Sequence, residues 1–142
     1  MRSFISFSKA VQIVIPLFVL MMLFHLTILV GITAFDVVPL DFLWGGRMSS
    51  KEELLLFELF SLIISGICLL IVLIRAGRIK LPALLKASRI ALWLLTVLFF
   101  LNTLGNLVAK TAFEKSFSLL TLVLALLCLR IALEPIGKNP AH

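Results

Sequence analysis

The chain has 142 residues, of which 62% are hydrophobic and 14% charged, and its mean hydropathy is +1.21. Soluble domains are about 45–50% apolar and about 25% charged. This composition therefore excludes a soluble domain and predicts an integral membrane protein. The net charge of +6 does not indicate nucleic-acid binding, because the basic residues flank the apolar segments, where membrane insertion favours them.

The first apolar segment, residues 11–35, contains Pro16 and His25. It is longer than the roughly 7–15 residues of a signal-peptide core, and no small-x-small cleavage site follows, so we interpret it as a retained span. Proline removes a backbone donor, and we expect Pro16 to bend or loosen the inner end of this helix. His25 is predicted to lie a little beyond mid-membrane.

The first loop, residues 36–49, is unusually apolar for a connecting segment. Its helix breakers are Asp36, Pro39, Asp41 and the pair Gly45-Gly46. In one interpretation the loop lies on the membrane interface and Trp44 is an anchor. In the other it is a lid over the helices, in which Arg47 reaches an acid such as Glu58 or Asp41.

The second span, residues 51–74, has two candidate capping boxes, because Ser49 and Ser50 are each followed by a glutamate three residues later. From residue 54 to residue 73 it is about 30 Å of helix, the thickness of a bilayer core. Glu58 lies roughly 10 Å inside the start of this helix. A carboxylate facing lipid costs several kcal/mol, so we expect Glu58 to face protein or water.

The third and fourth spans are predicted at 84–108 and 114–133, the fourth ending before Glu134-Pro135 with Arg130 reaching the interface. Asn102 and Asn106 are one turn apart near the far end of the third span, so they share a face. With no internal repeat or linker, residues 1–142 are predicted to form a single all-α membrane domain, a four-transmembrane-helix bundle.

Basic residues predict the orientation in the cell (inner) membrane. One side has nine of them: Arg2, Lys9, Arg75, Arg78, Lys80, Lys86, Arg89, Arg130 and Lys138. The other side has four: Arg47, Lys51, Lys110 and Lys115. Both termini are therefore expected in the cytoplasm.

The polar side chains within the spans concentrate in the outer half. Estimated depths are about 10 Å for Glu58, about 9 Å for Asn102 and about 15 Å for His25. These depths predict an outward-facing polar pocket. Its candidate lining residues are Glu58, His25, Asn102, Asn106, Ser61, Arg47 and Trp44.

A structural interpretation competes with this pocket, because small and polar residues recur at helical spacing on two spans. The stripes are Glu58, Ser61, Ser65 and Cys68 on the second span, and Ser118, Thr121, Ala125 and Cys128 on the fourth. Such stripes let membrane helices pack closely, and Glu58 would then only hydrogen-bond Asn102 or His25.

The sequence assigns no catalytic residue, metal ligand or cofactor. The two cysteines form no CxxC pair and are expected to be packed, reduced thiols. His25 and the terminal His142 do not make a metal site, and no nucleophile triad, HExxH or phosphate loop is present. A general acid/base pair of Glu58 and His25 acting on a lipid stays open.

The segment FLWGGRMSSKEELLLFELFSL resembles a stretch of small uncharacterised bacterial four-span membrane proteins, in which a WGGR loop precedes an acid-bearing span. This resemblance covers about residues 36–65 and implies no activity, since none is known for that group. The chain is also similar in size to the small multidrug exporters, but it has His25 where those carry an acid in the first span.

Three functions follow as hypotheses. The first is a non-enzymatic membrane protein that binds a small molecule, lipid or membrane partner through the outer-half pocket. The second is a small ion- or proton-coupled transporter, as a homodimer, with Glu58 as the coupling acid. The third is a lipid-modifying enzyme that uses Glu58 and His25. The expected partners are membrane lipids, with a homodimer or a membrane-protein partner compatible and no nucleic acid.

Overall fold

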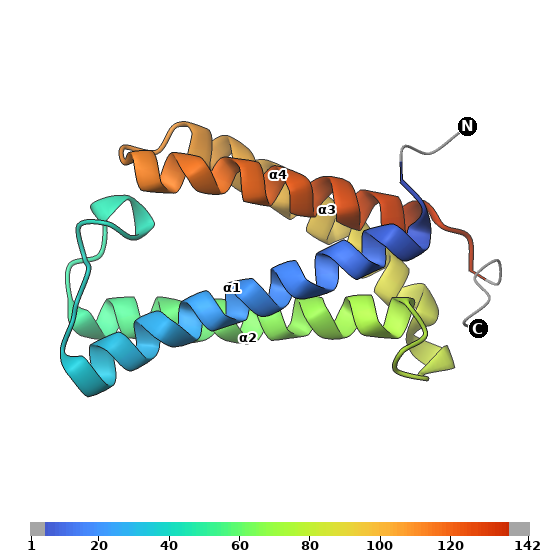
Figure 1. The fold of residues 1–142 in the computed structure, drawn as a ribbon, viewed down its shortest axis with the longest axis horizontal. Coiled ribbons are helices and arrows are strands. Elements are labelled where there is room, and N and C mark those ends of the chain that lie inside the picture. The colour runs from blue at the N-terminus through green and yellow to red at the C-terminus, as the bar shows by residue number, and fades with distance from the viewer. Residues whose placement is uncertain (1–4, 137–142) are drawn as a thin grey trace.

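The computed structural model describes residues 5–136 and confirms the all-α, four-span architecture (Figure 1). The helices are α1 (Phe7–Phe35), α2 (Lys51–Arg75), α3 (Leu85–Leu107) and α4 (Ala112–Leu133). Four helical segments are long and apolar enough to cross a membrane. Two short 3-10 helices, η1 (Trp44–Gly46) and η2 (Pro82–Leu84), lie in the connections. Arg2, Lys138 and His142 lie outside the described residues.

The starts of α2 and α4 are determined locally by side-chain caps. The hydroxyl of Ser50 accepts the backbone N–H of Glu53 at 3.1 Å, and the Glu53 carboxylate accepts the N–H of Ser49 at 2.8 Å. Of the two capping registers that the sequence permits, the structure therefore has Ser50 as the cap. In α4, Thr111 accepts the N–H of Glu114 at 3.2 Å.

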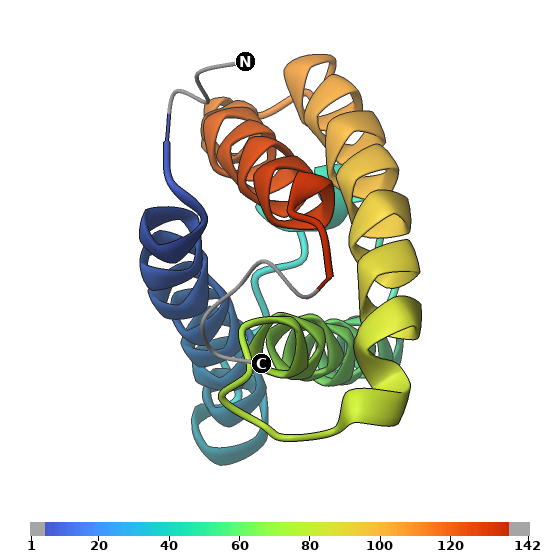
Figure 2. The ribbon, with the colours of Figure 1, turned by 90° about the vertical axis from the view of Figure 1, so that its right-hand side faces the viewer.

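The helices are arranged in a ring in chain order, with α1 and α3 diagonally opposite (Figure 2). Helix α1 crosses the bundle obliquely, so its start lies beside α4 and its end beside α2 (Figure 1). We call the end with loop 36–50 the distal end, and the end where α1 begins and α4 finishes the proximal end. All of the predicted site residues belong to the distal half of the chain's helices or to this loop.

The main core fills the proximal and middle parts of the bundle and contains Phe18, Leu92, Leu124 and Ile131. Most of the two predicted stripes are in the interior: Ser65, Cys68, Thr121, Ala125 and Cys128 are buried, whereas Ser61 and Ser118 are half-buried. Small side chains at these positions allow close helix packing.

Loop 36–50 folds over the distal end instead of lying free. Leu43 is 8% exposed and packs in a second, smaller core with Ile32 of α1 and Leu54 of α2. Burial of these apolar side chains fixes the path of the loop. It thereby positions the Trp44–Gly46 turn beside the bundle.

Asp36 caps the end of α1 and provides a pH-dependent contact. It has a left-handed backbone (φ 53°), and its carboxylate pairs with Lys51. The hydrogen bond and the charge of Lys51 hold the pKa of Asp36 below its usual value. Because the folded-state pKa is the lower one, the pair stabilises the fold above the unfolded pKa, and this contribution is lost as the pH falls through the folded pKa.

We expect Asp36→Asn to lower the melting temperature slightly near neutral pH, and the difference from the wild type to shrink as the pH falls below about 4. Asparagine tolerates the left-handed conformation, so the helix end is kept. Thermal unfolding in detergent across a pH series measures the difference. A difference that does not change with pH would contradict this origin.

Candidate functional site

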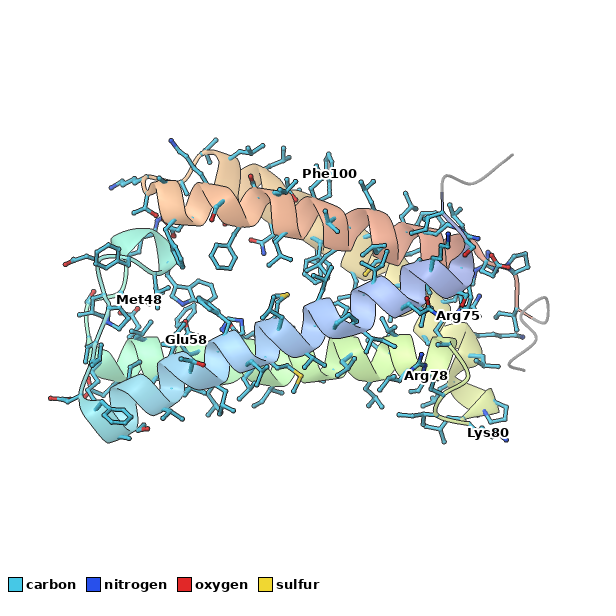
Figure 3. All side chains as sticks on the ribbon, viewed as in Figure 1. Met48, Glu58, Arg75, Arg78, Lys80 and Phe100 are labelled. Carbon is cyan, nitrogen blue, oxygen red and sulfur yellow. The ribbon has the colours of Figure 1, made fainter. Side chains whose placement is uncertain are left out.

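Glu58 is the buried acid around which the distal end is built. Its side chain is 1% exposed and lies on the interior face of α2, in line with Leu54 and Ser65. Figure 3 places it at the distal end of the bundle, near loop 36–50, far from Arg75 at the other end of the same helix. The carboxyl group thus faces protein and not the exposed outer surface of the helix.

Both carboxyl oxygens of Glu58 have a hydrogen-bond partner from a different segment. Nδ1 of His25, on α1, lies 2.7 Å from Oε2. The indole N–H of Trp44, in the loop, donates to Oε1 at 2.9 Å. An ionised Glu58 accepts the proton of the imidazole, and a protonated Glu58 donates to it, so one proton lies between the two groups in either state.

The turn that delivers Trp44 has an unusual backbone. Trp44, Gly45 and Gly46 have φ values of 54°, 72° and 63°. Glycine adopts this region without penalty, whereas a bulky residue there is strained, at a cost of order 1–3 kcal/mol. The indole hydrogen bond to Glu58 and the edge-on contact of the indole with Phe57, at 5.4 Å between ring centroids, oppose this strain.

A second acid, Glu114, holds the same turn from the opposite side of the bundle. The backbone N–H of Gly45 donates to Glu114 Oε1, and the hydroxyl of Thr111 donates to Oε2 at 2.9 Å. Glu114 is in the first turn of α4, so loop 36–50 is tied to α2 through Trp44 and to α4 through Gly45. These two contacts hold the loop between α2 and α4.

An aromatic cluster lies against the His25 side of the acid–imidazole pair. Phe24, next to His25 on α1, contacts Phe113 and Phe117 of α4 at 6.4 and 5.4 Å between ring centroids, and contacts the His25 ring at 5.5 Å. An apolar surround of this kind strengthens the hydrogen bonds inside it and makes an unpaired polar group there costly.

Hydrogen bonds join His25 and Trp44 to Glu58, whereas none joins Glu58 to the other predicted lining residues. Asn102 and Arg47 are exposed, and Asn106 and Ser61 are half-buried. Arg47 does not reach Glu58 in the lid; the residue that does so is Trp44. The depth estimated for Asn102 did not include the rotation of the helix. Helix α3 buries Phe99 and Thr103, and position 102 is turned about 60° from the first and about 100° from the second.

A polar cluster at the proximal end was not predicted. Arg75 is fully buried and donates to the carbonyl oxygen of Glu134, and Arg89 donates to that of Ala132 at 2.9 Å. Arg130 does not simply extend to the interface, since it donates to the Ile5 carbonyl at 2.7 Å and pairs with Glu134 at 2.9 Å. The three guanidinium groups thus donate hydrogen bonds to backbone carbonyl oxygens at the proximal end, where the end of α4 lies beside the start of α1.

One sequence feature could have indicated Glu114: it follows Thr111 by three residues, as in a capping box. Its contact with Gly45 joins positions 69 apart, and no local pattern predicts that contact. The same holds for Arg75 and Arg89, whose partners are backbone carbonyl groups that any sequence provides.

The arrangement can hold or transfer a proton between Glu58 and His25, whose separation is in the range that general acid/base pairs use. Among residues 5–136 there is no group of three or more potential metal-ligating side chains. No protein-family model, curated protein or solved structure matches the chain.

Proposed function

We propose that this is a non-enzymatic membrane protein that binds a small molecule, lipid or membrane partner at Glu58, beneath loop 36–50. The observation that carries the proposal is the hydrogen bond from the Trp44 indole to a carboxyl oxygen that is otherwise buried. A loop residue occupies the acceptor that a ligand would use. Opening of the loop frees that acceptor, and the ligand replaces the indole with a donor of its own.

The chemistry around Glu58 favours a ligand that carries an ammonium group on an apolar body. A carboxylate attracts such a cation, and the aromatic faces of Trp44 and Phe57 add cation–π attraction. The distal end also has six acids against four bases, although the whole chain has a net charge of +6. The acids are Asp36, Asp41, Glu52, Glu53, Glu58 and Glu114.

The same proposal places the distal end at the outer face of the cell (inner) membrane and both termini in the cytoplasm. The support is the distribution of basic residues, which are fewer at the distal end and concentrated in the link between α2 and α3 and at the proximal helix ends. A ligand would then enter from the outer leaflet.

Lipid retention tests the proposal, with phosphatidylethanolamine as the probe. The protein is placed in nanodiscs that contain equal amounts of phosphatidylethanolamine and phosphatidylcholine, and the lipids that stay bound are identified by native mass spectrometry. We expect the wild type to retain phosphatidylethanolamine several-fold over phosphatidylcholine, because only the former has N–H donors for Glu58. Glu58→Gln is expected to bring this ratio close to one.

Glu52→Gln is the matched control, because Glu52 is an exposed acid on the first turn of the same helix. It should retain the wild-type ratio. If the wild type shows no preference between the two lipids, or if Glu58→Gln keeps the same preference, an ammonium-bearing lipid is not the ligand of Glu58.

A second candidate function is proton-coupled transport, which the 2.7 Å contact between His25 and Glu58 favours. A buried acid and imidazole that share a proton are typical of proton relays in membrane proteins. In this function Glu58 takes up a proton when the substrate leaves. Proteoliposomes that contain a pH-sensitive dye would show proton flux with the wild type and none with Glu58→Gln.

A further inference from the structure

Asn102 has an exposed amide on α3 in a part of the helix that lies within the span. Helix α3 has 23 residues, or about 34 Å, against a hydrocarbon core of about 30 Å. Asn102 precedes the end of α3 by five residues, and is therefore about 5 Å inside the hydrocarbon. The described part of the chain gives its amide no hydrogen-bond partner.

Two other exposed polar side chains on the spans are satisfied locally. The hydroxyl groups of Thr27 and Thr33 donate to backbone carbonyl groups one turn earlier, each at 2.7 Å. Gln12 is also exposed, but it lies near the start of α1, and helical side chains point toward the start of their helix. Gln12 therefore extends toward its own membrane surface.

Asn102 has the opposite geometry, because it lies near the end of its helix. The same tilt directs its side chain toward the middle of the bilayer, where no water is present. A short asparagine side chain cannot turn back to the surface from there. Because residues 5–136 give this amide no partner, we look for one on another molecule.

We propose that this face of α3 packs against the same face of a second copy, with the two Asn102 amides hydrogen-bonded to each other. An amide has both a donor and an acceptor, so an identical residue satisfies it. Two copies inserted in the same orientation bring Asn102 to the same depth, and a twofold axis along the membrane normal places the two side chains opposite each other. No other helix is guaranteed to provide a polar group at that level.

The neighbouring residues on α3 suit such a contact. Gly105, less than one turn further on, is exposed, and a Cβ added there would meet nothing within 4 Å. Glycine beside a polar residue lets two helix backbones approach closely enough for interhelical hydrogen bonds. Leu98 and Leu101, exposed by 58% and 57%, complete the face. This surface is separate from the site at Glu58.

Cysteine cross-linking in membranes locates the interface. Leu98 lies about 40° from Asn102 around the helix, and Phe100, at 50% exposure, lies about 160° away (Figure 3). In vesicles of phosphatidylethanolamine and phosphatidylglycerol we expect Leu98→Cys to form a disulfide-linked dimer on mild oxidation, and Phe100→Cys to stay monomeric. The buried Cys68 and Cys128 are common to both variants, so any background is matched.

The contribution of Asn102 to dimerisation is measured by energy transfer between labelled copies, while added lipid dilutes the protein in the membrane. Asn102→Leu should weaken dimerisation about 3- to 30-fold, the range for interhelical hydrogen bonds, and Asn102→Gln should be closer to the wild type. Equal cross-linking at both positions, cross-linking at Phe100→Cys alone, or no energy transfer in the wild type would overturn the proposal. Unchanged dimerisation in Asn102→Leu would do the same. Neither measurement depends on ligand binding at Glu58.

Discussion

Replacing His25 with leucine is expected to lower the free energy of unfolding by about 3–5 kcal/mol, because it breaks a buried pair by removing one partner. Glu58 is 1% exposed, and leucine leaves its Oε2 with no donor in a buried site. The buried carboxyl oxygen then lacks a hydrogen-bond partner unless water enters the bundle. Unfolding by steric trapping in bilayers, or by heat in detergent, measures the loss.

The double variant Glu58→Gln with His25→Leu separates the contribution of the His25–Glu58 hydrogen bond from the contribution of the packing of the His25 ring. Glu58→Gln alone is expected to cost less than His25→Leu, since an amide can still accept from Trp44 and donate to Nδ1 of the imidazole. In a Glu58→Gln background, His25→Leu should cost only about 1–3 kcal/mol, because an uncharged amide is left unpaired. A cost for His25→Leu that is the same in both backgrounds would show that the histidine contributes by packing alone. Thr27→Val, on the same helix, is the control and should cost less than about 1 kcal/mol.

The other large effect is expected at the proximal end, where Arg75→Ala should cost about 3–4 kcal/mol. The guanidinium group is fully buried, donates to the Glu134 carbonyl group and lies 5.8 Å from the centroid of the Phe7 ring. Alanine leaves a cavity between the end of α2 and the end of α4, and deprives a carbonyl oxygen at the end of α4 of its charged donor. The same unfolding measurements apply.

Arg78→Ala is the control for this prediction, because Arg78 is an exposed arginine three residues further on (Figure 3). It should change the free energy of unfolding by no more than about 0.5 kcal/mol. Arg75→Lys keeps the charge but not the planar guanidinium group that donates to the Glu134 carbonyl group, so its cost should lie between the two. If Arg75→Ala and Arg78→Ala cost the same, the buried arginine does not stabilise the junction of α2 with α4.

The sequence by itself determined which segments are helices. Each apolar run of about 20 residues must satisfy its own backbone in a membrane, and only a helix does so within a single segment. Ser50 and Thr111 then mark the helix starts through hydrogen bonds that reach only three positions along the chain. The burial of Glu58 was also predictable, because a carboxylate that faces lipid is costly.

Only the tertiary structure decided which groups meet. Depth in the membrane can be estimated by counting residues, and the estimated depths placed His25 near the level of Glu58. Asn102 shows that depth is not sufficient, because a rotation of about 100° around the helix moves a side chain from the interior to the surface. The contacts of Trp44 with Glu58, of Gly45 with Glu114 and of Arg75 with Glu134 join residues 14, 69 and 59 positions apart. They depend on how the helices rotate and cross when their small-residue faces pack. The free energy of this packing is a property of the assembled bundle and not of any one segment.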